Sequence, residues 1–179
     1  MVGVRISEDL QAEIRSWAGK QDNNPPLATA IRRLVELGRR SLAGQRYSEA
    51  AALLNTALGL WRGDAVADTT RHLISMEQSY LEEQRVEALE LRIEAELVLG
   101  LQRELIPELR RLVARYPLRE RLRALLMTAL YRAERQADAI ALFQDCRRVL
   151  DEELGVAPGR LLSRTYEGVL TGEASSLMP

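Results

Sequence analysis

The sequence has few of the residues from which catalytic and metal-binding sites are usually built. Its 179 residues include one cysteine and one histidine, so an internal disulfide and a zinc site made of cysteines are excluded. Aromatic residues make up only 4% of the chain, which disfavours a β-sandwich and a surface that stacks nucleic-acid bases. No apolar run approaches the roughly 20 residues of a membrane span, and the N-terminus lacks an apolar secretory segment. We therefore expect a soluble protein located in the cytoplasm.

The motifs of common enzyme classes are also missing. The segment 155–159, GVAPG, has neither the lysine nor the preceding strand of a phosphate-binding loop, and no serine lies in a nucleophile elbow. His72 has no second histidine, and no cysteine near it in the sequence, with which to bind a metal. The acidic runs 82–83 and 151–153 are typical of solvated helix faces, since paired catalytic acids need a cleft. We expect no enzyme activity, no catalytic residue, no metal and no cofactor.

The charge balance permits contact with DNA without requiring it. The formal net charge of the chain is −1. Residues 1–40 contain seven Lys or Arg and five Asp or Glu, whereas the remainder contains eighteen and twenty-one. The N-terminal part is therefore slightly basic and the rest slightly acidic, a difference too small to identify a nucleic-acid-binding protein.

What the chain does contain is a repeated helical pattern. The chain is 46% hydrophobic, and its apolar residues recur at helical spacing. Leu105, Leu109 and Leu112 are followed 34 residues later by Ala139, Phe143 and Cys146. A 34-residue period of small and apolar positions on paired helices is typical of a tetratricopeptide-like array. Such helix pairs bury their apolar faces only by stacking, and the stack presents a surface to a partner. The pattern favours recognition over catalysis.

The pattern predicts one short strand followed by about eight helices. In residues 2–7, apolar and other residues alternate as they do in a strand, and Ser7 is placed to cap the helix that follows. That helix ends near residues 19–22, and Asn24 and Pro25 are suited to start the next one. The later helices are predicted at 27–42, 48–61, 75–99, 102–116, 118–132, 136–154 and 158–170, and residues 171–179 are expected to form a flexible tail.

Three motifs in the helical part carry a family resemblance. They are LWRG at 60–63, YPLRE at 116–120 and ELGVAPG at 153–159. Together with the acidic long helix, they resemble the bacterial transcriptional activation domain of the Streptomyces antibiotic regulatory protein family, over roughly residues 31–170. The resemblance implies an all-helical, tetratricopeptide-like domain that works beside a DNA-binding head and engages the transcription machinery.

The N-terminal segment resembles a ribbon-helix-helix module, on VRISEDL at 4–10 and LATAIRRLVELG at 27–38. This resemblance implies a homodimer in which two strands form an antiparallel ribbon that enters the major groove. Carried over to this chain, the base-facing positions are Gly3, Arg5 and Ser7. The start of the second helix, around Asn24, offers free backbone amides to a phosphate.

Several of these residues have a second interpretation. Arg5 either pairs with a guanine edge or is an exposed charge that keeps an edge strand from aggregating. Arg32 and Arg33, like Arg39 and Arg40, either bind phosphates or form the solvated face of an amphipathic helix. Trp61 either anchors a partner or packs against the loop after it, and Cys146 fits a buried, inert thiol.

The predicted fold is thus an all-α tetratricopeptide-like bundle with a short N-terminal β-strand and a ribbon-helix-helix-like head. The predicted domains are 1–42 for DNA binding and dimerisation and 43–170 for activation, with 27–42 shared between them and 171–179 as the tail. The predicted function is a dimeric DNA-binding transcriptional regulator whose helical domain contacts RNA polymerase or another regulator. The alternative is a tetratricopeptide-like interaction scaffold that does not bind DNA.

Overall fold

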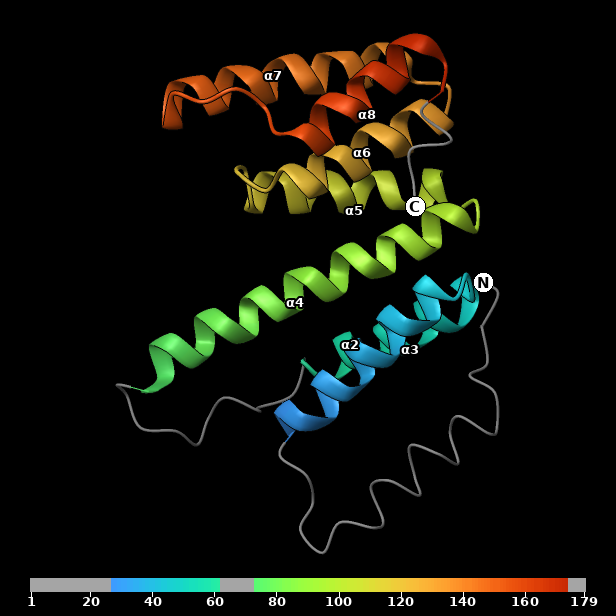
Figure 1. Cartoon of the computed structure of the whole chain (residues 1–179), viewed down its shortest axis with the longest axis vertical. Coiled ribbons are helices and arrows are strands. Elements are labelled where there is room, and N and C mark those ends of the chain that lie inside the picture. The colour runs from blue at the N-terminus through green and yellow to red at the C-terminus, as the bar shows by residue number, and fades with distance from the viewer. Residues whose placement is uncertain (1–26, 62–72, 174–179) are drawn as a thin grey trace, which may run out of the picture. The chain divides into compact units, whose positions relative to one another are not determined.

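The computed structural model describes residues 27–61 and 73–173, and within these ranges every regular element is an α-helix (Figure 1). The predicted helical domain is therefore confirmed, while the predicted strand at 2–7, the helix after it and most of the tail lie outside the described residues. The helices fall into two compact units that divide between Leu99 and Gly100. Unit 1 contains α2 (Leu27–Ala43), α3 (Tyr47–Leu60) and α4 (Leu73–Val98); unit 2 contains α5 (Gln102–Arg115), α6 (Glu120–Arg132), α7 (Gln136–Leu154) and α8 (Arg160–Thr171).

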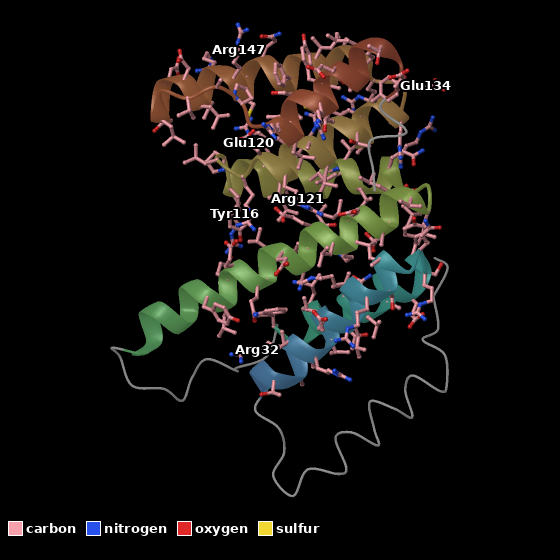
Figure 2. The ribbon with its side chains drawn as sticks, viewed as in Figure 1. Arg32, Tyr116, Glu120, Arg121, Glu134 and Arg147 are labelled. Atoms are coloured by element: carbon pink, nitrogen blue, oxygen red, sulfur yellow. The ribbon has the colours of Figure 1, made fainter. Side chains whose placement is uncertain are left out.

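Two helices begin later than the sequence pattern predicts. Helix α6 starts at Glu120 and not at residue 118, because the chain still turns at Tyr116, whose carbonyl accepts the Arg119 amide at 3.0 Å (Figure 2). Helix α8 starts at Arg160 and not at residue 158, because Gly159 is extended at the N-cap, with φ −68° and ψ 170°. Helix α7 has its predicted bounds and ends at Gly155, whose φ of 66° lies in the left-handed region that glycine tolerates.

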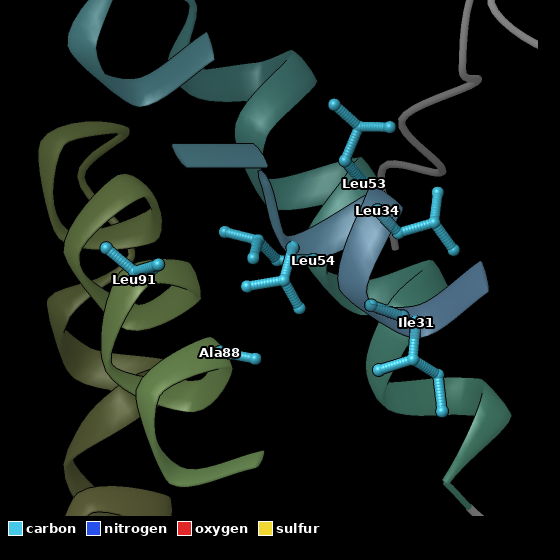
Figure 3. Close-up of a cluster of buried hydrophobic side chains, with 8 residues drawn as sticks. Ile31, Leu34, Leu53, Leu54, Ala88 and Leu91 are labelled. Atoms are coloured by element: carbon cyan, nitrogen blue, oxygen red, sulfur yellow. The ribbon is translucent and has the colours of Figure 1, made fainter. Parts of the chain in front are cut away.

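The core of unit 1 forms where α2 and α4 pack on α3. Figure 3 shows Ile31 and Leu34 of α2 on one side of the α3 leucines, with Ala88 and Leu91 of α4 on the other. Trp61 is half-buried and packs against this cluster, while the loop that we expected it to contact lies outside the described residues. The cluster consists of Ile31, Leu34, Val35, Leu53, Leu54, Ala57, Ala88 and Leu91.

In unit 2 the central element is α6, which packs on α5, α7 and α8. Its nine consecutive residues from Leu122 to Leu130 are all buried, as expected for a helix with neighbours on several sides. The repeat positions Leu105, Leu109, Ala139, Phe143 and Cys146 are buried as predicted. The prediction for the remaining repeat position, Leu112, was wrong by one residue. Leu112 is half-buried, and Val113 occupies the core position in its place. The buried stripe of α5 thus runs at i, i+4, i+8.

Across residues 27–61 and 73–173, none of the helices combines the length and the apolar character of a membrane span.

Candidate nucleic-acid and partner interfaces

The predicted phosphate-binding arginines lie on the exposed side of α2. The Arg32 guanidinium carbon is 5.5 Å from the centroid of the Tyr80 ring of α4 (Figure 2), a cation–π contact between two helices of unit 1. Arg33 is exposed, and within the described part of the chain it makes no ion pair or hydrogen bond. The structure thus leaves Arg33 open to a phosphate and gives Arg32 a packing role. The other predicted DNA contacts lie outside the described residues: Gly3, Arg5, Ser7 and Asn24.

The two later arginines of α2 are engaged with carboxylates. Arg39 pairs with Glu36 at 3.3 Å and with Glu87 of α4 at 2.6 Å, and Arg40 pairs with Glu36 at 3.0 Å. These side chains are 40–63% exposed, so each pair contributes at most about 1 kcal/mol. For these two arginines the geometry favours the solvated helix face over a phosphate site.

A better shielded ion pair lies within α4, where this helix packs against α3. The Arg92 guanidinium is 2.8 Å from the Glu96 carboxylate, with side-chain exposures of 9% and 12%. The same carboxylate accepts the side-chain amide of Asn55 at 3.1 Å. The Glu96 carboxylate therefore has structural partners from both helices, which is the usual arrangement for a shielded charge.

In unit 2 the structure brings two of the sequence motifs together. The backbone amide of Gly159, the N-cap of α8, donates to the carboxylate of Glu120, the first residue of α6, at 2.6 Å. In a capping box the N-cap amide donates a hydrogen bond to a glutamate of the same helix. Here the acceptor is a glutamate of another helix. A Cβ at Gly159 would lie 3.1 and 3.2 Å from the two carboxylate oxygens, so a larger residue there requires the Glu120 carboxylate to shift by a few tenths of an ångström.

The second support of the same turn is Arg123, which the sequence analysis missed. Arg123 is only 3% exposed; its Nε donates to the Pro117 carbonyl at 2.9 Å, and its Nη1 lies 3.6 Å from the Asp145 carboxylate of α7. A charged residue within the mostly apolar run 122–130 was the available signal, because a buried arginine needs partners. Arg123 and Glu120 together join the α5–α6 turn to α7 and α8.

Cys146 lies beside this group of charges. The thiol is fully buried, and burial raises its pKa even though Arg123 acts in the opposite direction. A buried thiol that holds its proton is a poor nucleophile. The prediction of a buried core cysteine is confirmed by its position.

Removing the Glu120 carboxylate should loosen unit 2. We expect Glu120→Ala to lower the free energy of unfolding by about 1–2 kcal/mol, because hydrogen bonds to charged groups contribute about 1.5–3 kcal/mol and solvent reaches this one. The measurement is urea unfolding followed by circular dichroism. Glu167→Ala is the matched control, since it removes the same charge from an exposed position of α8. Equal losses for the two variants would contradict a specific role for the Glu120–Gly159 bond.

Residues 28–170 match a family of known proteins, the bacterial transcriptional activator domain. Regulatory protein AfsR of Streptomyces griseus is 41% identical over 172 residues, which is 96% of this chain and 18% of AfsR. The alignment leaves only 4% of this chain unaligned, which is fewer residues than the segment 1–26 contains. It therefore includes part of that segment. Regulatory protein DnrI of Streptomyces peucetius is 40% identical over 145 residues, which is 80% of this chain and 53% of DnrI.

The fold also has a counterpart among solved structures. The structure of Mycobacterium tuberculosis EmbR in complex with a low affinity phosphopeptide aligns with a TM-score of 0.77 and 29% sequence identity. The match covers 88% of this chain and 43% of the EmbR chain. The chain therefore spans from about a fifth to about half of the length of these relatives.

Proposed function

This chain belongs to the family of bacterial transcriptional activator domains, and we propose on that basis that it acts in transcriptional regulation as a protein-contact module joined to a DNA-binding head. The observation that carries the proposal is the match of residues 28–170 to this family, which is supported by an all-helical fold over the same residues. The relatives are named as regulatory proteins, and an enzymatic role is not part of the proposal. The helical domain would contact RNA polymerase or another regulator.

Helix α2 is the proposed link between the head, residues 1–42, and the activation domain, residues 43–170. One side of α2 places Ile31 and Leu34 in the core of unit 1. Arg33 lies on the other side and is exposed, since successive residues are separated by about 100° around a helix. A helix that serves both domains needs two such sides. This supports assigning residues 27–42 to both domains.

The proposed head is a homodimer that reads DNA with a ribbon of two strands. Gly3, Arg5 and Ser7 would face the bases, with Arg5 paired to a guanine edge in the major groove. The amides near Asn24 and the Arg33 guanidinium would contact phosphates, and Arg32 would join them from its place beside Tyr80. Base contacts then determine the sequence that is bound, whereas phosphate contacts supply affinity that falls with salt.

The test is a gel-shift series with duplexes that the wild-type chain selects from a random library. We expect Arg5→Ala to weaken binding to the selected duplex by on the order of 10-fold while barely changing binding to random sequence, as a lost guanine contact would. Arg33→Ala should weaken both equally and reduce the salt slope by about 1. Arg40→Ala is the control, because Arg40 is already paired with Glu36. Full sequence-specific binding by Arg5→Ala would refute the ribbon assignment.

The oligomeric state separates this proposal from the alternative scaffold without DNA binding. A ribbon needs two copies to cover the apolar residues of the strand at 2–7, so sedimentation should show a dimer that is lost when residues 1–7 are deleted. A strict monomer at micromolar concentration, together with no selected duplex, would instead favour the scaffold.

A further inference from the structure

The net positive charge of unit 2 comes from one helix. Residues 100–179 contain thirteen arginines and eleven Asp or Glu. Helix α5 holds four of these arginines and two of the acids, so the rest of the unit has nine of each. The excess positive charge of unit 2 therefore lies entirely on α5.

Three of these arginines share the exposed face of α5. With about 100° between successive residues, Arg103, Arg110 and Arg111 lie in an arc of about 100° that also contains Pro107 and Ala114. All five are exposed. The opposite side of the helix is buried and consists of Leu105, Ile106, Leu109 and Val113. The arginines thus project from unit 2 on the side away from its core.

No acid neutralises these three arginines within the described residues. None of them makes an ion pair or a hydrogen bond there, in contrast to two other exposed arginines of unit 2. Arg135 pairs with Asp138, and Arg148 pairs with Asp145 and Glu152. Three like charges held within about two helical turns repel one another, and an anion placed between them relieves the repulsion.

The surface between the arginines contains a proline and a small residue. Pro107 lies inside the helix and has no amide hydrogen, so it cannot donate to the Arg103 carbonyl as an ordinary residue would. Ala114 is a small residue on the same face. A second helix can therefore approach closely here, with its own side chains on either side of the proline.

The spacing favours an acidic helix over a nucleic acid. Arg103 and Arg110 are seven residues apart, or about 10.5 Å along the helix axis, and carboxylates seven residues apart on a partner helix have the same separation. Duplex DNA has one charge per about 1.7 Å of its axis and would also bring phosphates near Glu104 and Glu108, which lie along one edge of this face. A protein helix can place its carboxylates opposite the arginines alone.

We propose that Arg103, Arg110 and Arg111 of α5 form a docking surface for an acidic amphipathic helix of a partner protein. The inference rests on the proposed role of the helical domain in protein contact and assigns that contact to one face. It does not depend on how the head binds DNA.

The experiment measures fluorescence anisotropy with the full chain and a designed peptide probe. The labelled peptide has roughly 25 residues, long enough to form a helix in water, with glutamates at seven- and eight-residue spacing and alanine and leucine between them. A scrambled peptide has the same composition without the spacing. The variant is Arg103→Gln/Arg110→Gln/Arg111→Gln, and the matched control is Arg147→Gln/Arg160→Gln/Arg164→Gln. The control arginines are equally exposed and equally unpaired residues of unit 2.

We expect the α5 variant to weaken peptide binding at least 10-fold. The control variant should bind the peptide as the wild type does, and the scrambled peptide should bind less tightly than the spaced one, which separates the effect of spacing from that of charge. Because Gln and Arg have similar helix propensities, both variants should unfold at the wild-type urea concentration. Binding that is equally weakened by the control variant, or equally strong for the scrambled peptide, would overturn the proposal. So would tighter binding to a random-sequence duplex that the α5 variant abolishes, which would make the face a nucleic-acid surface.

Two further results distinguish the docking surface from a self-association surface and from the DNA-binding head. Self-association of the chain that disappears in the α5 variant would make a second copy the occupant and overturn the proposal. Selected-duplex binding should be unchanged in the α5 variant. Loss of peptide binding with intact DNA binding therefore supports the docking surface, while loss of DNA binding in Arg5→Ala concerns the head alone.

Discussion

Replacing Phe143 by alanine is expected to lower the free energy of unfolding of unit 2 by about 3–5 kcal/mol, the usual range for a buried Phe→Ala change. Phe143 of α7 is 8% exposed and stacks on Tyr166 of α8, with ring centroids 3.9 Å apart and planes 4° apart. Nearly face-to-face rings are not the most favourable arrangement, so most of the loss comes from burial. The measurement is urea unfolding of the full chain, monitored by circular dichroism.

Two milder variants divide this effect into its parts. Phe143→Leu keeps most of the buried volume and should cost clearly less than the alanine variant. Tyr166→Phe keeps the stacked ring but removes the hydroxyl that accepts the Gln144 amide at 3.3 Å, a long and exposed hydrogen bond, so its effect should be small. A loss below about 1 kcal/mol for Phe143→Ala would contradict the central packing role of this ring.

The second large effect is expected at the contact between α2 and α3. Gly38 lies in the middle of α2, where alanine would normally gain about 0.8–1.0 kcal/mol in helix propensity. Its added Cβ, however, would lie 2.6 Å from Cγ of the fully buried Leu54. That distance requires a branched core side chain to move, and overpacking of this kind costs about 1–3 kcal/mol. We expect Gly38→Ala to be destabilising overall, with a lower urea midpoint.

The cause can be isolated with a double-mutant cycle and a second glycine. In a Leu54→Ala background the clash is absent, so Gly38→Ala should become neutral or stabilising, with a coupling energy within the range of about 0.5–3 kcal/mol seen for residues in contact. Gly59→Ala is the control, because Gly59 is in α3 and a Cβ there meets nothing within 4 Å. It should stabilise by up to about 1 kcal/mol. Destabilisation by Gly38→Ala that persists without Leu54 would rule out the steric explanation.

The helices and the family could be predicted because both depend on local patterns. Apolar residues at helical spacing predict a helix wherever they occur, and the motifs at 116–120 and 153–159 occur in a fixed order along the chain. The resemblance over residues 31–170 agrees with the family match over 28–170. The late helix starts fall at turns: the starts of α6 and α8 depend on the backbone of Arg119 and Gly159, which periodicity does not specify.

The candidate interfaces could be predicted only as residue types. The sequence shows four arginines on the second predicted helix, but it cannot show which of them are paired. The structure places Arg39 beside Glu87, 48 residues away, and Arg32 beside Tyr80, while Arg33 stays exposed. The two α5 arginines next to each other, Arg110 and Arg111, give no signal in the sequence that distinguishes them from paired arginines elsewhere.

The sequence by itself determined that this chain is helical, that its helices pair, and which family it belongs to, because these follow from the order and spacing of residues along one dimension. Only the tertiary structure decided that Glu120 caps α8 across 39 residues, that Gly38 must stay small for Leu54, and that Arg103, Arg110 and Arg111 remain unpaired on one face of α5. Each of these depends on which residues lie within a few ångströms of each other in space, a distance that separation along the chain does not determine.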